Sequence, residues 1–124
     1  MQRITVNLIV KSIEECLPFW EGRLGFDRAV EAPEGDVLGF VVLEKDGLEI
    51  MMQTPQSLAN DIVELSGATY KTFLYIHVDD LEPIRSALVD HAKVIPERET
   101  FDGVKELVVR DPAGNVVIFG QRID

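Results

Sequence analysis

Three side chains with useful chemistry alternate along one short apolar segment of the sequence. Phe73, Tyr75 and His77 occupy every second position of residues 72–78, a segment rich in β-strand formers. Side chains alternate between the two faces of a strand, so all three point to the same face. The aromatic rings can stack on a planar or cationic ligand, and the histidine can transfer a proton or bind a metal. The segment predicts a binding surface, with ordinary structural packing as the alternative.

A carboxylate lies in a second apolar segment. Glu49 stands among Leu48, Ile50, Met51 and Met52. Such a charge belongs either to a solvated sheet face or to a site that meets a basic ligand group, and both interpretations stay open. Met51 shares the face of Glu49, because the two are two positions apart, and its flexible side chain suits a loose binding site as well as an ordinary core.

Other catalytic motifs are absent from the sequence. It contains no glycine-rich phosphate loop, no paired-cysteine metal motif and no Gly-x-Ser-x-Gly elbow. Its single cysteine, Cys16, cannot form an internal disulfide and is interpreted as a small buried hydrophobe. We expect no nucleotide chemistry, no catalytic residue and no cofactor.

Composition restricts the partners further. The 124 residues are 46% hydrophobic and 27% charged, with a net charge of −10. This charge repels phosphate backbones and anionic lipids, so nucleic acid and membrane are not expected partners, whereas a cationic ligand is favoured. The first residues lack the features of a signal peptide, which predicts a cytoplasmic protein.

The same series of elements occurs twice along the chain. The first series is a strand at 3–10, a helix that begins after the capping box of Ser12, strands at 26–32, 37–45 and 48–53, and a short helix after Thr54. The second is a strand at 72–78, a helix capped by Asp79 and Asp80, and strands at 93–98, 104–110 and 115–120. Pro18 is expected to kink the first helix.

The two series can be aligned with nearly constant spacing. Val10 and Val78, which end the first strand of each series, are 68 residues apart, and the turn glycines Gly47 and Gly114 are 67 apart. We therefore predict an α+β fold in which residues 1–124 form a single domain. Its two βαβββ modules, residues 1–66 and 67–124, are related by a pseudo-twofold and form a curved sheet around a cleft.

Two motifs carry a resemblance to a known family. They are Phe19-Trp20-x-x-Arg23-Leu24-Gly25-Phe26 and Arg110-Asp111-Pro112-Ala113-Gly114-Asn115. With the duplicated βαβββ pattern, the chain resembles the vicinal-oxygen-chelate superfamily, which includes glyoxalases, extradiol dioxygenases and bleomycin-resistance proteins. The motifs are most similar to the bleomycin-resistance branch. They specify a fold shared by many functions.

The resemblance implies four positions that hold a divalent metal in the superfamily's enzymes. They correspond here to Thr5, Met51, Phe73 and Ile118. A metal of this kind needs about three or four oxygen or nitrogen donors, and these positions supply one hydroxyl. We therefore expect no metal, while a rearranged site that uses His77 and Glu49 stays a weaker alternative.

The resemblance also implies which side chains face the cleft. Since the four metal positions point into it, so do the residues two positions away on the same strands, and Phe40 adds a further wall. The ligand-binding residues predicted in this way are Asn7, Phe40, Glu49, Met51, Phe73, Tyr75 and His77, with Gln53 on the same face.

These expectations give two hypotheses of function. The first is a metal-free protein, similar to bleomycin-resistance proteins, that sequesters an aromatic or cationic small molecule in the cleft. The second is a metal-dependent lyase, isomerase or dioxygenase of the glyoxalase-like superfamily with rearranged ligands. A homodimer is expected in either case, because an apolar sheet face needs a cover.

Overall fold

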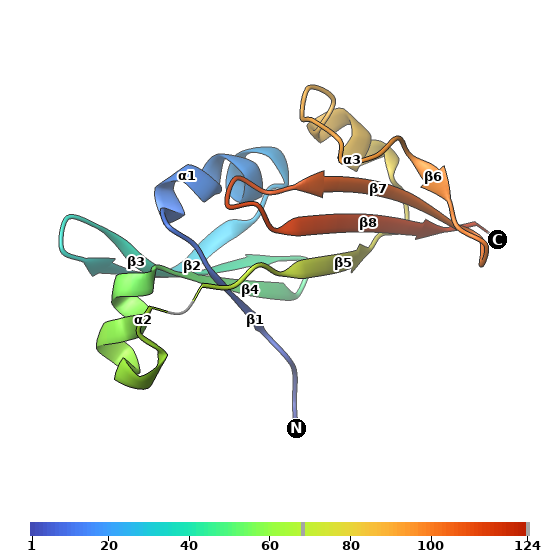
Figure 1. Cartoon of the computed structure of the whole chain (residues 1–124). Helices are drawn as coiled ribbons and strands as arrows, with labels where there is room; N and C mark the ends of the chain where they lie inside the picture. Colours follow the sequence, from blue (N-terminus) through green and yellow to red (C-terminus); the bar gives the residue numbers. More distant parts are fainter. Residues whose placement is uncertain (68, 124) are drawn as a thin grey trace. The chain divides into compact units, whose positions relative to one another are not determined.

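The chain folds into two compact units. A computed structural model describes residues 1–67 and 69–123. The units are Met1–Lys71 and Thr72–Asp124, drawn in blue to green and in yellow to red in Figure 1. Each contains a four-stranded mixed sheet, with the strand orders β1-β4-β3-β2 and β5-β8-β7-β6. These orders are the same once the modules are aligned, which confirms the predicted α+β fold of two βαβββ modules. A single domain around a cleft stays a prediction.

Unit 1 contains the first sheet and most of the helical residues. Its strands are β1 (Val6–Ile9), β2 (Asp27–Glu34), β3 (Val37–Lys45) and β4 (Leu48–Gln53); its helices are α1 (Ile13–Leu17), η1 (Pro18–Arg23), α2 (Pro55–Asp61) and η2 (Val63–Leu65). β1 runs parallel to β4, and the other neighbours are antiparallel. The expected strands are all present, with β1 shorter than predicted.

The first helix begins and changes where the sequence indicates. The hydroxyl of Ser12 accepts a hydrogen bond from the backbone N–H of Glu15 at 3.3 Å, as expected of an N-cap. At Pro18, which has no N–H to donate, α1 gives way to the π-helical segment η1. The expected kink is therefore a change of helix type, in which Leu24 N–H bonds to the carbonyl of Phe19.

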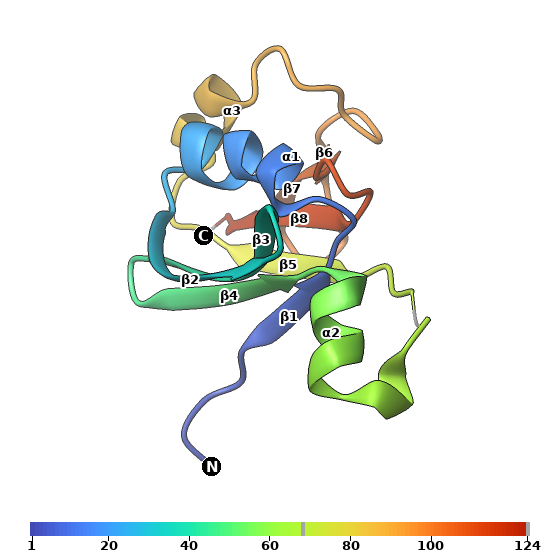
Figure 2. The ribbon, with the colours of Figure 1, turned by 90° about the vertical axis from the view of Figure 1, so that its left-hand side faces the viewer.

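The core of unit 1 lies between α1, η1 and one face of the sheet. Figure 2 shows α1 over the strands. Trp20 is fully buried and makes edge-on contacts with Phe19 and Phe26 at ring centroid distances of 5.2 and 5.5 Å. Buried residues of the sheet on this side are Leu8, Val41, Leu43 and Met52, and Cys16 of α1 is buried as expected. The alternate residues of the same strands occupy the opposite face.

Unit 2 repeats the pattern with fewer helical residues. Its elements are β5 (Phe73–His77), α3 (Glu82–Ala87), β6 (Arg98–Glu99), β7 (Val104–Arg110) and β8 (Val116–Arg122). The predicted strand at residues 93–98 is wrong: only Arg98–Glu99 forms a strand, preceded by one isolated bridge between Lys93 and Val109. Pro96 has no N–H for a strand ladder, which explains the interruption.

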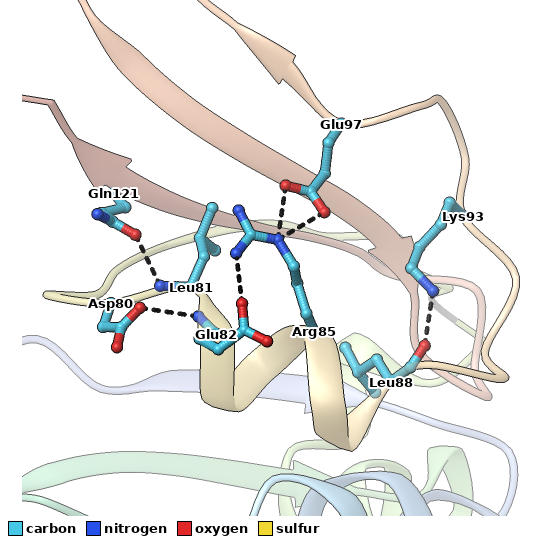
Figure 3. Close-up of polar contacts among 8 residues, drawn as sticks. All are labelled: Asp80, Leu81, Glu82, Arg85, Leu88, Lys93, Glu97 and Gln121. Carbon is cyan, nitrogen blue, oxygen red and sulfur yellow. Dashed lines mark hydrogen bonds and ion pairs between the residues drawn. The ribbon is translucent and has the colours of Figure 1, made fainter.

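Polar contacts attach α3 to the rest of unit 2. Figure 3 shows Gln121 accepting from the N–H of Leu81 at 2.8 Å, and Asp80 accepting from Glu82 at 2.9 Å. Arg85 forms ion pairs with Glu82 and Glu97, both at 2.9 Å. The expected cap by Asp79 and Asp80 is not formed as predicted: the N-cap of α3 is Leu81, and Asp80 lies one residue before it. Beneath the helix, the buried side chains are Leu81, Leu88, Leu107, Val109 and Phe119.

No helix within residues 1–67 and 69–123 is both long and apolar enough to cross a membrane.

Candidate functional site

One face of the unit 2 sheet brings aromatic and charged side chains together. We call it the Tyr75 face, and define it by Phe73, Tyr75, His77, Arg98, Glu106, Ile118 and Gly120, which alternate with the buried residues beneath α3. Phe73 is 76% exposed and Tyr75 is 41% exposed. The rings of Tyr75 and His77 lie 5.0 Å apart at 49°. The predicted trio of β5 therefore lies on one face, with its rings accessible.

The hydroxyl of Tyr75 reaches across a strand to a carboxylate. It donates a hydrogen bond of 2.6 Å to Oε2 of Glu106 on β7. The ring crosses over Gly120 of β8, where an added Cβ would lie 2.3 Å from the hydroxyl oxygen and 2.7 Å from two ring carbons. Only glycine allows this approach, because every other residue has a Cβ. Gly120 is therefore required for the Tyr75–Glu106 contact.

Glu106 is also bound by an arginine. Its Oε1 accepts from Nε of Arg98 at 3.0 Å and lies 2.9 Å from Nη2 of the same side chain. The side chain of Glu106 is 7% exposed, whereas that of Arg98 is 56% exposed. A buried carboxylate needs such partners, because burial without them is strongly unfavourable. Both of its oxygens are thus engaged, one by Tyr75 and one by Arg98.

We expect Gly120→Ala to disrupt this cluster. The new methyl group would displace the Tyr75 ring and break its hydrogen bond to Glu106. Because the ring is the proposed stacking surface, ligand affinity should fall. A crystal structure or the tyrosine ring signals in an NMR spectrum would report the displacement. Gly22→Ala is a suitable control, because no atom of the described part of the chain lies within 4 Å of a Cβ at that position. An unchanged Tyr75 ring in Gly120→Ala would contradict this geometry.

The environment of Tyr75 raises its pKa to about 12, from an ordinary value of 10. Partial burial is the largest cause, followed by the hydrogen bond to Glu106 and the repulsion between that carboxylate and a phenolate. Since the folded pKa is raised, the stability that it contributes is complete below about pH 10 and is lost as pH rises towards 12.

Alkaline titration followed by phenolate absorbance should show this group ionising near pH 12. Glu106→Gln removes the carboxylate but leaves the burial, so the pKa of Tyr75 should fall part of the way towards 10. Tyr75→Phe identifies the signal, because it leaves Tyr70 as the only tyrosine. If the pKa of Tyr75 were the same in Glu106→Gln as in the wild type, the proposed effect of Glu106 on Tyr75 would be contradicted.

The corresponding face of unit 1 carries amides and a carboxylate. We call it the Asn7 face, and define it by Asn7, Phe40, Val42, Glu49, Met51 and Gln53. In the register, Met51 lies between Asn7 and Val42, Gln53 lies opposite Phe40, and Glu49 lies opposite Glu44. Nδ2 of Asn7 donates to Oε1 of Gln53 at 3.0 Å, and Nε2 of Gln53 donates to Ser57 at 3.1 Å. Asn7 donates in this chain of bonds and uses its Nδ2, and its Oδ1 is an amide acceptor on the same side chain.

Glu49 already has partners on this face. Thr5 donates to its Oε1 at 3.2 Å, and Nη2 of Arg3 lies 3.6 Å from the same atom. Phe40 and Met51 are half-buried neighbours in register with Gln53 and Asn7. Asn7, Glu49 and Met51 thus share one face as predicted from parity, and Phe40 lies on the same face. The role of all four in ligand binding stays a prediction.

The four family metal positions do not suit a divalent cation. Met51 and Phe73 offer a thioether and a ring, Ile118 is apolar, and Thr5 uses its hydroxyl to bind Glu49. Hard cations bind oxygen and imidazole ligands, so this donor set does not fit the metal of the superfamily's enzymes. Across residues 1–67 and 69–123, no three His, Cys, Asp or Glu side chains are grouped so that they could hold a metal ion.

Sequence reasoning missed three residues of the Tyr75 face: Arg98, Glu106 and Gly120. A signal for Glu106 was available, because it is a charge within the apolar segment Val104–Arg110, as Glu49 is within β4. No sequence pattern indicates the hydrogen bond between Glu106 and Tyr75, because that contact depends on the register of β5, β8 and β7.

Comparison with known proteins agrees with this architecture. Residues 3–119 match the family model described as the Glyoxalase/Bleomycin resistance protein/Dioxygenase superfamily. No curated protein matches the chain.

Solved structures share the fold at low sequence identity. TioX from Micromonospora sp. ML1 has a TM-score of 0.80 at 18% identity, covering 99% of this chain and 100% of its own. A lactoylglutathione lyase from Agrobacterium tumefaciens has a TM-score of 0.78 at 17% identity, covering 98% and 94%. A glyoxalase/bleomycin resistance protein/dioxygenase from Nocardioides has 0.78 at 13%, covering 100% and 85%. Because the family model spans nearly the whole chain, the protein belongs to the glyoxalase/bleomycin resistance protein/dioxygenase superfamily.

Proposed function

We propose that the chain is a metal-free binding protein that sequesters an aromatic small molecule and releases it unchanged, as bleomycin-resistance proteins sequester theirs. One observation carries the proposal: the rings of Phe73 and Tyr75 are exposed side by side on β5. Large aromatic side chains are usually covered, so an exposed pair, one ring of which is fixed by the bond from Tyr75 to Glu106, supports stacking on a ligand. Phe73 also stands where the family's enzymes need a metal ligand.

Of the two ligand classes expected from the sequence, the contacts favour the aromatic one. The rings of Phe73 and Tyr75 could also attract a cation, but the two carboxylates of these faces that were considered above already have arginine neighbours. Glu49 lies near Arg3 and Glu106 is paired with Arg98, so a cation that bound either carboxylate would compete with an arginine. Aromatic stacking requires no such exchange.

A matched set of probes tests this function. Naphthylmethanol, naphthoate and naphthylmethylammonium carry the same ring with no charge, a negative charge and a positive charge. Titration followed by NMR should show at least one of them binding and shifting the signals of Phe73 and Tyr75. If none of the three binds at millimolar concentration, the proposed function is wrong.

The second candidate, a metal-dependent enzyme using His77 and Glu49, predicts a different result. We expect the purified protein to contain no stoichiometric metal, and its melting temperature not to rise when Ni, Zn, Mn or Fe is added. A metal that binds the folded state must stabilise it by mass action. Stoichiometric metal that disappears in His77→Ala would favour the enzyme over the binding protein.

We also propose a homodimer. Apolar side chains of unit 1, including Val30, Val37 and Leu48, are about half exposed, which supports a further protein contact. A stable symmetric dimer should bury at least about 1,000 Å² in total. Light scattering should therefore give twice the mass of 13.9 kDa at micromolar concentration. A mass of one chain would contradict the assembly.

A further inference from the structure

We infer that the Tyr75 face selects ligands that carry a carboxylate, and that Arg98 is the residue that recognises it. This inference rests on the proposed function and adds the chemical class of the ligand. It assigns to Arg98, Glu106 and Tyr75 a shared task in which the ring stacks on the ligand and the guanidinium binds its acid group.

The guanidinium of Arg98 has more N–H donors than its contacts with Glu106 use. Its contacts with Glu106 use Nε and Nη2, along one side of the group. An arginine has five N–H donors in a planar fork, so the contacts made within residues 1–67 and 69–123 leave both hydrogens of Nη1 and one of Nη2 for a ligand. The side chain is 56% exposed, which allows a ligand carboxylate to reach this outer edge and form two parallel hydrogen bonds.

Glu106 holds Arg98 in a defined orientation. Its two oxygens are bound to different partners, Arg98 and Tyr75, so the carboxylate fixes the guanidinium and the phenol relative to each other. Because these two side chains are already ordered, less side-chain entropy is lost when a ligand binds, and the binding free energy is more favourable. The acid group and the ring of a ligand therefore meet partners that are already positioned.

The fold does not require a carboxylate at this position. In the other module, the residue that corresponds in register is Phe40, which pairs with Gln53 as Glu106 pairs with Gly120. Unit 1 thus forms the same ladder with an apolar residue there. Because burying a charge is unfavourable without a function or good partners, the Glu106–Gly120 combination is better explained by the placement of Arg98 and Tyr75.

The charge of this face also favours an anion, although the chain has a net charge of −10. By strand alternation, β7 and β8 place Arg110 and Arg122 on the same face as Arg98, with Glu106 as the acidic member of β7 there. Asp102 interacts electrostatically with Arg122 and balances part of its charge. Nη1 of Arg110 lies 3.4 Å from the backbone carbonyl of Gly114, a neutral group, so Arg110 adds positive charge to this face.

The three naphthyl probes test the inference with two kinds of variant. We expect the wild-type protein to bind naphthoate at least about tenfold more tightly than naphthylmethylammonium, because a charge-assisted pair adds to the shared stacking. Arg98→Gln should abolish the preference. Arg98→Lys keeps a positive charge beside Glu106 but loses the fork, and it should reduce the preference while the chain stays folded.

Arg85→Gln provides the matched control. Arg85 also pairs with glutamates at 2.9 Å, but it lies on α3 and contacts no residue of the Tyr75 face among the interactions described (Figure 3). This variant removes the same charge and should keep the naphthoate preference. Melting temperatures of all variants report folding, and Arg98→Lys carries the test if Arg98→Gln does not fold.

The outcomes separate the two proposals. If none of the probes binds, the proposed function and this inference both fail. If the probes bind with equal affinity, or if Arg98→Lys and Arg98→Gln keep the full naphthoate preference, the protein binds aromatic ligands but the assignment of Arg98 is wrong. An equal loss in Arg85→Gln would show an effect of overall charge and would also overturn the assignment.

Discussion

Tyr75→Ala is expected to weaken the binding of a naphthyl probe by about 5- to 150-fold while leaving the chain folded. The ring is 41% exposed, so its removal takes away a stacking surface rather than core packing. Truncating a central aromatic residue of a binding site commonly costs about 1–3 kcal/mol of binding free energy, which corresponds to this range. Affinity from NMR or calorimetric titration and the melting temperature should be measured on the same samples.

The alternative for Tyr75 predicts the opposite pattern. If the residue were core packing, its truncation would open a cavity and cost about 3–5 kcal/mol of unfolding free energy. Tyr75→Phe is the matched control, because it keeps the ring and removes only the hydrogen bond to Glu106. A large loss of stability in Tyr75→Ala, with unchanged affinity per folded molecule, would rule out Tyr75 as a binding residue.

Trp20→Ala should destabilise the protein by about 3–5 kcal/mol. Trp20 is fully buried in unit 1 and makes T-shaped contacts with two further rings, Phe19 and Phe26. Its loss removes both the buried area and the ring contacts, and leaves a cavity that the surrounding segment η1 can fill only partly. Urea denaturation followed by circular dichroism measures the change in unfolding free energy.

Phe73→Ala is the control for this prediction. It also removes an aromatic ring, but the ring is 76% exposed, and the stability should change by no more than about 0.5 kcal/mol. Equal losses for Trp20→Ala and Phe73→Ala would contradict the assignment of one ring to the core and the other to an exposed face.

Much of the fold could be predicted because the two modules share local signals. The turn residues Gly47 and Gly114 both adopt positive φ angles, 77° and 87°, which favour glycine. Each glycine marks the turn of one hairpin, β3–β4 or β7–β8, so the equal spacing of the two modules can be read from the sequence. The facing of Phe73, Tyr75 and His77 could also be predicted, because alternate residues of a strand point to the same face.

The predictions missed two features, one for a local and one for a long-range reason. The strand expected at residues 93–98 was wrong because Pro96, which has no N–H for a strand ladder, overrides the β propensity of its neighbours. The Tyr75–Glu106 bond joins residues 31 positions apart and requires the close approach at Gly120. Such a contact is specified by strand register, which single-sequence patterns do not reveal.

The most direct test of binding without a metal and without conversion is native mass spectrometry of protein treated with EDTA and then mixed with naphthoate. We expect a complex with the mass of the polypeptide plus intact naphthoate, no metal, and release of naphthoate with its mass unchanged. A complex that forms only after a divalent metal is restored, or release of a chemically altered compound, would contradict the account and favour a metal-dependent enzyme.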